Sequence, residues 1–185
     1  VIGCLVYIGT KTFKNVIVMK LFLFCIPVFL CLRLSGVMGS EVIENISINF
    51  FDNQRVESLS YRLSQEDAIF ERVKEKLFFG WGGYGRARII DEDGGKVLRT
   101  MDSLWLITYS TFGIVGLLAL FCGMLGGAYK VLSVYKKVEY SLGGSVVYSL
   151  LLSLIVIIFM FDQLLNGMVN PIYILISGAL SGYYR

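Results

Sequence analysis

One uncharged run constrains this chain more than any other feature. From Ser103 to Tyr129 the sequence holds 27 residues without Asp, Glu, Lys or Arg, between Asp102 and Lys130. A helix needs only about 20 such residues to cross a bilayer. Of the 185 residues, 56% are hydrophobic and only 17% are charged, which is a low charged share for a soluble domain. We therefore expect an integral membrane protein.

Three further apolar stretches are predicted to cross the membrane. They are residues 16–38, 141–165 and 169–184. The middle stretch is apolar on every helical face at its centre, so it needs lipid or protein on all sides. The last begins near Pro171, and proline suits a first helical turn because its missing N–H has no partner there anyway. Together with 104–129, these stretches predict an all-α polytopic membrane protein with about four transmembrane helices.

The N-terminal residues extend this prediction. Residues 1–15 are interpreted as the end of a preceding span and a basic cytoplasmic turn, so we expect the sequence to be the C-terminal part of a longer protein. In the span at 16–38, Lys20 and Arg33 are expected to extend toward the lipid headgroups. An alternative is that Met19 to Gly39 is a signal peptide with small residues before its cleavage site.

Charge is distributed unevenly along the chain. Residues 39–103 contain twelve acidic and nine basic side chains, whereas the rest contains two acidic and eight basic ones. An excess of Lys and Arg in short loops marks the cytoplasmic side of a membrane protein. The rule places residues 130–140 and the C-terminus in the cytoplasm, and it places 39–103 outside as one large external (periplasmic) loop.

Composition also excludes several kinds of chemistry. The chain has no His, which rules out Ser/His/Asp and Cys/His nucleophile systems and His-ligated zinc within it. The cysteines all lie inside apolar runs and are expected to be small buried side chains: Cys4, Cys25, Cys31 and Cys122. A net charge of +3 gives no support for a nucleic-acid partner, and no metal or cofactor is expected.

The external loop is too rich in Phe, Ile and Leu to be disordered, and connections of this length are usually functional. Ser64 and Asp67 have the spacing of a capping box, which predicts an amphipathic helix over 65–78. Its apolar stripe would comprise Leu63, Ile69, Phe70, Val73 and Leu77. The opposite face, expected to be mostly solvated, carries Glu66, Glu71, Arg72, Lys74, Glu75 and Lys76.

Residues 80–88, GWGGYGRAR, have the most unusual composition in the chain. Their glycines permit close approach to a ligand or positive φ, and Trp81 and Tyr84 offer flat faces on which sugar rings pack. Arg86 and Arg88 supply forked donors suited to phosphate oxygens. The spacing fits neither a P-loop nor GxGxxG. The alternative is a glycine-rich turn whose two aromatic side chains anchor at the membrane interface.

The end of the external loop contains two further features. Residues 88–99 predict a short β-hairpin with its turn at 93–95. Asp102 lies at the junction between the loop and the span that begins at Ser103. It is expected either to cap that helix or to act as a carboxylate that accepts a proton or orients a hydroxyl at the membrane surface.

From Arg62 to Gly116 the sequence resembles the O-antigen ligase and polysaccharide polymerase superfamily of bacterial membrane glycosyltransferases. The resemblance rests on Arg62, the acidic pair Glu66-Asp67, an amphipathic helix, GWGGYGR at 80–86, TMDSLW at 100–105, and a span containing Gly113 and Gly116. The tail from Asn170 to Gly182 is similar to the last span of these proteins. Arg72 and Gly83 fit the spaced Arg and Gly pattern of the superfamily's external loop.

The resemblance implies an enzyme of the bacterial inner membrane. Members of the superfamily join sugar chains carried on polyprenyl pyrophosphate at the outer face, in surface polysaccharide synthesis, without a metal or nucleotide. The implied partners are the polyprenyl-pyrophosphate-linked oligosaccharide, membrane lipid and other polysaccharide-assembly membrane proteins. Superfamily members are longer and have more spans, so this stretch alone is expected to be inactive.

Site residues follow from the same resemblance. The loop arginines would hold the donor pyrophosphate and stabilise the leaving group. The predicted substrate-binding residues are Arg62, Arg86, Arg88, Arg72 and Gly83, with Trp81 and Tyr84 as sugar platforms. The His expected before the span in the ligase branch is absent, and Asp102 stands nearest its place as base or acceptor orienter. This departure favours a polymerase or another branch over lipid A core ligation.

Two other functions remain compatible with the sequence. A transporter or flippase of lipid-linked sugars predicts polar groups deep within the spans, but those after Ser103 have almost none except Asp162 near an end. A non-catalytic membrane subunit would instead use the apolar face of the helix at 65–78 to bind a partner protein.

Overall fold

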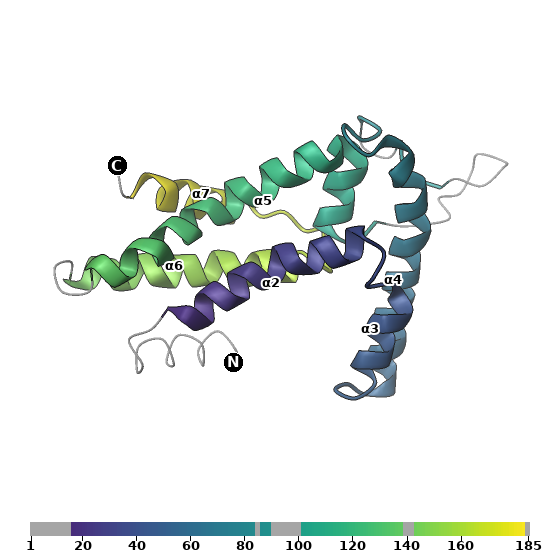
Figure 1. Ribbon diagram of the computed structural model, residues 1–185, viewed down its shortest axis with the longest axis horizontal. Coiled ribbons are helices and arrows are strands. Elements are labelled where there is room, and N and C mark those ends of the chain that lie inside the picture. The colour runs from purple at the N-terminus through teal and green to yellow at the C-terminus, as the bar shows by residue number, and fades with distance from the viewer. Residues whose placement is uncertain (1–15, 84–85, 90–100, 139–142, 184–185) are drawn as a thin grey trace. The chain divides into compact units, whose positions relative to one another are not determined.

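The computed structural model describes residues 16–83, 86–89, 101–138 and 143–183, and every regular element within these ranges is helical (Figure 1). The α-helices are α2 (Ile17–Leu34), α3 (Ser40–Ser47), α4 (Asn53–Val73), α5 (Leu104–Val138), α6 (Gly143–Asp162) and α7 (Pro171–Gly182), and a short 3-10 helix, η1 (Lys74–Lys76), follows α4. The predicted all-α class is confirmed for this part of the chain. Most of the predicted hairpin at 88–99 lies outside the described residues.

The chain divides into two compact units. The loop unit comprises the described residues 29–83, 86–89, 101–118 and 165–167, and the apolar unit comprises 16–28, 119–138, 143–164 and 168–183. Helices α2 and α5 contribute residues to both units. The loop unit therefore contains the described part of the predicted external loop together with the adjoining ends of two apolar helices.

Two helices are long and apolar enough to cross a membrane. They cover Ile17–Leu34 and Leu104–Tyr135, whereas Val146–Asp162 and Pro171–Gly182 are shorter apolar helices. Each of the four overlaps a stretch that the sequence singles out as apolar. The two long helices are compatible with a membrane protein. Helix α5 continues to Val138, so most of the expected connection at 130–140 is helical.

In the apolar unit, α7 packs against α6 and begins where the sequence predicts. Pro171 is its first residue, and the side chain of Asn170 accepts a hydrogen bond of 3.0 Å from the N–H of Ile172. This cap satisfies one of the free donors at the helix start. Tyr173 stacks on Phe159 of α6 with 3.8 Å between the ring centroids.

The contact between α5 and α7 is close because small residues face one another. The hydroxyl of Ser177 donates to the carbonyls of Gly123 and Met124, at 2.8 and 2.9 Å. A Cβ added at Gly127 would lie 2.8 Å from the Ser177 carbonyl oxygen and 2.9 Å from the N atom of Ser181. Small residues spaced four apart, with backbones in contact, are typical of helix pairs in membranes.

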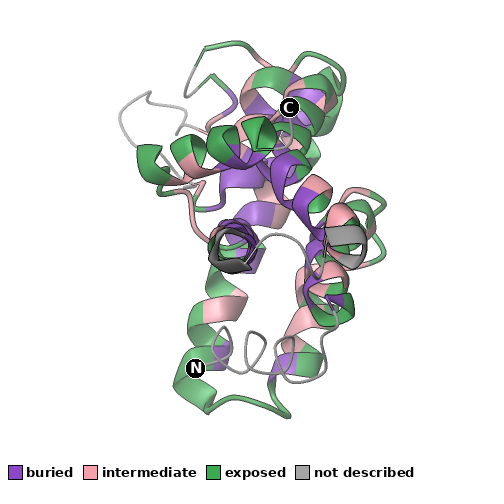
Figure 2. Cartoon of the chain, turned by 90° about the vertical axis from the view of Figure 1, so that its left-hand side faces the viewer, coloured by how far each residue is buried: buried purple, intermediate pink, exposed green. Residues whose placement is uncertain are grey.

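Exposed positions occur along the apolar helices (Figure 2), and many of them are occupied by large apolar side chains or cysteines. Exposed examples are Leu21 and Phe24 on α2, Ile155 and Ile158 on α6, and Ile172 and Leu175 on α7. Cys25, Cys31 and Cys122 are also exposed, so the prediction of buried cysteines was wrong for these three; Cys4 lies outside the described residues. The reason is that the described part of the chain does not cover every face of these helices.

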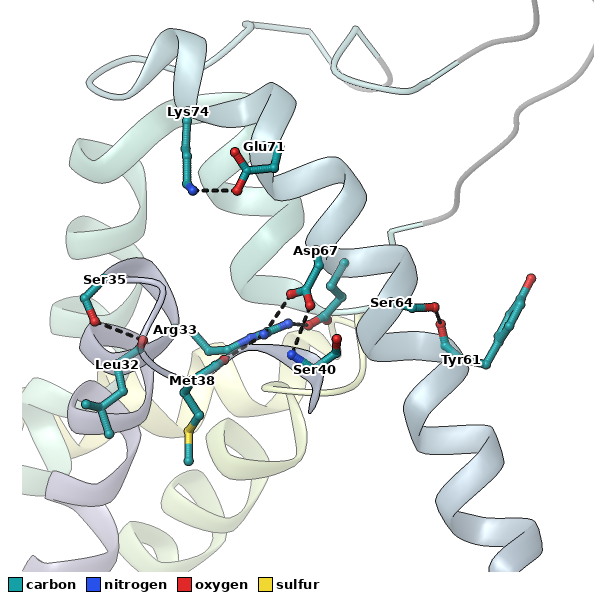
Figure 3. Close-up of polar contacts among 11 residues, drawn as sticks. Leu32, Arg33, Ser35, Met38, Ser40, Tyr61, Ser64, Asp67, Glu71 and Lys74 are labelled. Atoms are coloured by element: carbon teal, nitrogen blue, oxygen red, sulfur yellow. Dashed lines mark hydrogen bonds and ion pairs between the residues drawn. The ribbon is translucent and has the colours of Figure 1, made fainter. Parts of the chain in front are cut away.

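In the loop unit, α3 lies beside α4, which begins much earlier than the sequence predicts (Figure 1). Its buried positions extend back through Leu63 to Val56, and the helix starts at Asn53. Ser64 is therefore inside the helix, where its hydroxyl donates to the carbonyl of Tyr61 at 2.8 Å (Figure 3). The predicted capping box was wrong because a short polar side chain inside a helix can bond the preceding turn instead.

The end of α4 also differs from the prediction. The helix ends at Val73, and η1 and a turn follow it, so Leu77 is 44% exposed instead of completing the apolar stripe. Ile69, Phe70 and Val73 are buried as expected. The Phe70 ring packs against Trp105 and Tyr109 at the start of α5, with centroids 6.1 and 6.0 Å apart.

The start of α5 is completed by a segment distant in sequence. The carbonyl of Ser103 accepts the N–H of Ile107, so Ser103 and not Asp102 occupies the N-cap position. The N–H of Leu104 donates to the carbonyl of Asn166 at 3.2 Å. The backbones of Asp102 and Gly167 are so close that a Cβ on the glycine would lie 3.0 Å from the Asp102 carbonyl oxygen. The capping role considered for the Asp102 carboxylate was therefore wrong.

Candidate functional site

The glycine-rich loop is held against a break in α5. At Gly113 the backbone leaves the helix, with φ 67° and ψ −162°, a conformation almost confined to glycine. Four backbone hydrogen bonds join the loop to the break: Trp81 N–H to the Ser110 carbonyl (2.8 Å), Gly82 N–H to Thr111 (3.0 Å), Ile114 N–H to Leu77 (2.9 Å) and Val115 N–H to Phe78 (3.4 Å). These bonds fix the position of residues 77–82.

Two glycines allow the backbones to approach so closely. Gly80 has φ 67°, and a Cβ there would lie 2.6 Å from the carbonyl carbon of Thr111. A Cβ at Gly113 would collide with the carbonyl group of Phe78. A side chain at either position would also have to adopt positive φ. Gly80 and Gly82 thus adopt the positive φ that the glycine composition permits.

Cationic side chains surround Trp81. The Arg72 guanidinium carbon lies 5.1 Å from the Trp81 ring centroid, and Lys76 Nζ lies 4.4 Å from it. The Arg86 side chain lies against the backbone of Gly82 and Gly83. A Cβ added to Gly82 would be 3.6 Å from Arg86 Nη1, and a Cβ added to Gly83 would be 3.5 Å from Arg86 Nε. We call this group the Trp81 cluster: Arg72, Lys76, Trp81, Gly82, Gly83 and Arg86.

The positive charge of the Trp81 cluster is not neutralised within the described part of the chain. No ion pair there involves Arg72, Lys76 or Arg86, whereas neighbouring Lys74 and Glu71 pair with each other at 2.6 Å (Figure 3). Arg72 Nε and Trp81 Nε1 are buried donors without a hydrogen-bond partner among the described residues. Free donors and uncompensated cations at one place favour an anionic ligand with several oxygen acceptors.

Exposed apolar side chains adjoin these cations in the sequence. Phe78 and Phe79 precede the first glycine of the loop and are 65% and 78% exposed. Exposed aromatic side chains of this size are uncommon on a surface that faces only water. The site therefore combines an anion-binding part with an adjoining apolar part.

The other predicted site residues lie elsewhere or outside the described residues. Arg62 is exposed on α4, ten residues before Arg72 and about 15 Å from it along the helix axis, so it does not join the cluster. Arg88 is half-buried, and Tyr84 lies outside the described part. Asp102 is exposed at the start of α5, roughly 12 Å along that helix from the residues that bind the loop.

Lys76 is the member of the cluster that the sequence analysis missed. Its charge was assigned to a solvated helix face together with those of its neighbours. The available signal was its spacing: Lys76 follows Arg72 by four residues, which places both on one side of a helical segment. Recognising it required knowing that the chain turns at 77–79 and brings Trp81 back over that side.

A second polar group in the loop unit is a buried ion cluster. Arg33 Nη2 lies 3.1 Å from Glu66 Oε2, and Arg33 Nη1 lies 2.8 Å from Asp67 Oδ1. The same arginine donates to the Met38 carbonyl, and the N–H of Ser40 donates to Asp67 (Figure 3). Arg33 was expected near the headgroups and Glu66 on a solvated face. Both predictions were wrong, because each of these side chains is about 95% buried by the other and by the surrounding helices.

Burial raises the pKa of the Glu66 carboxyl because removal from water disfavours its charged form, and the nearby Asp67 carboxylate adds a smaller effect in the same direction. The Ser103 hydroxyl, which lies near this carboxyl without a hydrogen bond of good geometry, and the Arg33 guanidinium lower the pKa without reversing the shift. Because Arg33 and Glu66 are closed to solvent, with Asp67 at the edge of the cluster, we assign the cluster a structural role in joining the end of α2 to α4.

Comparisons with known proteins identify no family for this chain. No protein-family model, curated protein or solved structure matches it. The chemistry of the Trp81 cluster, its apolar neighbours and the helices that hold it therefore provides the basis for a functional assignment.

Proposed function

We propose that this chain is part of an integral membrane glycosyltransferase of the O-antigen polymerase or ligase type. The enzyme would join polyprenyl-pyrophosphate-linked oligosaccharides in surface polysaccharide synthesis. The observation that carries the proposal is the Trp81 cluster, with three cations that form no ion pair within the described residues, beside exposed Phe78 and Phe79. A pyrophosphate attached to a polyprenyl chain has a matching anionic part and a matching apolar part.

The cations have a direct role in such a reaction. When the anomeric carbon is attacked, the bond to the pyrophosphate oxygen breaks and negative charge develops on the leaving group. Arg72, Lys76 and Arg86 supply fixed positive charge and donors for that oxygen, which lowers the barrier more than uniform substrate binding would. Trp81 contributes mainly by holding two of these cations and by its free Nε1 donor, since its ring is already in contact with them.

Asp102 remains the proposed group on the acceptor side. Its carboxylate is exposed at the start of α5, where an incoming sugar hydroxyl can reach it. Orienting or deprotonating that hydroxyl requires only one carboxylate within hydrogen-bond distance of it. In this proposal the Trp81 cluster stabilises the leaving group, and Asp102 orients the acceptor hydroxyl.

The proposed arrangement in the bacterial inner membrane is multi-pass, with residues 39–103 outside and the C-terminus in the cytoplasm. It is supported by the contact of small residues between α5 and α7 and by the exposed apolar side chains of α6 and α7. Helix α6 has 20 residues and rises about 30 Å, which matches the hydrocarbon core. Helix α7 has 12 residues and rises about 18 Å, so the residues before Pro171 must provide the rest of that crossing.

The test uses membranes that contain the complete protein and a polyprenyl-pyrophosphate oligosaccharide. Product length and released polyprenyl pyrophosphate are followed for wild type, Arg72→Ala, Lys76→Ala, Arg86→Ala and Asp102→Asn. Each Ala variant is expected to lower transfer by about 10-fold or more, as the loss of a charge-assisted hydrogen bond worth roughly 1.5–3 kcal/mol implies. Arg55→Ala, an exposed arginine on α4 outside the cluster, is the matched control.

Two outcomes would contradict the proposal. Unchanged transfer in all three Ala variants would show that the cluster does not bind the donor. Absence of any transfer, with the lipid-linked sugar moving to the opposite leaflet, would indicate the alternative function of a flippase.

A further inference from the structure

The hydrogen bonds at the break in α5 have a specific relation to those of an unbroken helix. In a regular α-helix the N–H of residue 114 bonds the carbonyl of residue 110, and the N–H of 115 bonds the carbonyl of 111. These are the same four backbone groups that residues 77–82 bond in the structure. The loop thus takes the place of two helical hydrogen bonds in α5.

We infer that residues 77–82, which we call the strap, and the two sides of the break in α5 are alternative partners for one another. In one state the strap is docked and the helix is broken at Gly113. In the other state the strap is released, Ile114 bonds Ser110, and Val115 bonds Thr111. Release exposes the strap's own backbone groups to solvent, so neither state leaves any of these backbone groups buried without a partner.

The residues at the break in α5 favour exchange between these two states. Gly113 adopts both the observed positive φ and ordinary helical angles, so the conversion needs a change at one residue without a Cβ. The broken helix places Gly116 so close to Phe112 that a Cβ on Gly116 would collide with the Phe112 Cβ. In a regular helix the Cβ atoms of such a pair are about 5–6 Å apart, so this contact belongs to the broken state alone.

The exchange has a consequence for the Trp81 cluster. Trp81 belongs to the strap, whereas Arg72 and Lys76 belong to α4 and η1. Docking holds the ring against the two cations, and release separates them. The state of α5 thereby determines whether the cluster is assembled, whatever ligand the cluster binds.

Two substitutions displace the strap from opposite sides. Gly80→Ala places a Cβ about 2.6 Å from the backbone of Thr111, so it directly prevents the strap from docking on α5. Gly116→Ala collides with Phe112 of α5 itself, which supplies the three atoms nearest to the added Cβ, so it acts on the helix. Gly126→Ala, elsewhere in α5, is the matched control because its Cβ would have no heavy atom within 4 Å.

Hydrogen exchange of the complete protein in detergent is the measurement. Both test variants are expected to accelerate exchange at Trp81 and Gly82 by about tenfold or more, while Ile114 and Val115 stay protected because the helix closes. The control is expected to exchange like wild type. Unchanged exchange of α7 amides shows that each variant is folded.

The inference is overturned by either of two results. The first is that Gly116→Ala leaves Trp81 and Gly82 as protected as in wild type, which would show that the helix does not control the strap. The second is that Gly80→Ala releases the strap but Ile114 and Val115 exchange equally fast, which would show that α5 stays broken without it.

Discussion

At the scale of single residues, the Arg33 cluster couples protonation to stability. Glu66 and Asp67 both contact the one guanidinium, so a proton on Glu66 leaves Arg33 and Asp67 as a neutral ion pair. The protonated form is the one that burial favours, and the pKa of Glu66 is accordingly raised. The folded protein therefore holds this proton more tightly than the unfolded chain does.

This coupling predicts how stability depends on pH. An acid whose pKa is higher in the folded state stabilises the fold less as pH rises from its unfolded value, about 4.3 for Glu, through the folded value. The free energy of unfolding of wild type, minus that of Glu66→Gln, should fall across this window and level off above it. Denaturant unfolding in detergent at several pH values measures the difference.

The matched control for that experiment is Glu57→Gln, which removes an exposed carboxylate from the same helix. A wild-type minus Glu66→Gln difference that stays flat, or rises with pH, would contradict the raised pKa.

The residues of the Trp81 cluster were predictable from the sequence where the chemical type of the side chain was sufficient to select them. Arg72, Trp81, Gly83 and Arg86 were selected as residue types suited to phosphate and sugar, and the structure brings them together. Glu66 was placed on the solvated face although it is three residues from both Leu63 and Ile69, which are buried. Its partner Arg33 lies on a different helix, and no local pattern reveals a contact between such distant positions.

At the scale of elements, the contact between α5 and α7 gives a prediction about Gly127. Gly127→Leu would force a side chain into the backbone of α7 at Ser177 and Ser181. Overpacking of this kind costs about 1–3 kcal/mol, so the melting temperature of the protein in detergent should fall. Gly126→Leu adds the same side chain at the preceding residue of α5, where an added Cβ would have no described heavy atom within 4 Å, and should leave the melting temperature unchanged. Equal effects of the two variants would show that α5 and α7 do not meet at this point.

Helices were easier to locate than their ends and interruptions. The uncharged run from Ser103 predicts a helix because an apolar segment in a membrane must satisfy its own backbone groups. The break at Gly113 has no comparable local signal, since several other glycines in α5 are helical. It arises from hydrogen bonds to residues 77–82, and such a long-range contact is not encoded in periodicity.

At the scale of the whole molecule, the proposed topology is open to a direct test. Glu57 is exposed on α4, and Ser133 is exposed near the end of α5. In a protein whose own cysteines are replaced, Glu57→Cys should react with a membrane-impermeant maleimide in cells with a permeabilised outer membrane. Ser133→Cys should react only after the inner membrane is opened, because the loop rich in Lys should face the cytoplasm.

Labelling of both positions from the same side would rule out the proposed orientation. Protein recovered from the soluble fraction would contradict the membrane assignment as a whole, which rests on two long apolar helices and their exposed apolar surfaces.

The bond between Leu104 and Asn166 bears on the order in which the protein is made. A ribosome releases the chain from its N-terminal end, so α4 and the strap emerge well before the residues that complete the start of α5. The N–H of Leu104 in the loop unit cannot pair with the carbonyl of Asn166 until α5 and α6 have been synthesised. Completion of the loop unit is thereby a late event in biogenesis, and in a chain truncated before residue 165 that unit should be more sensitive to added protease.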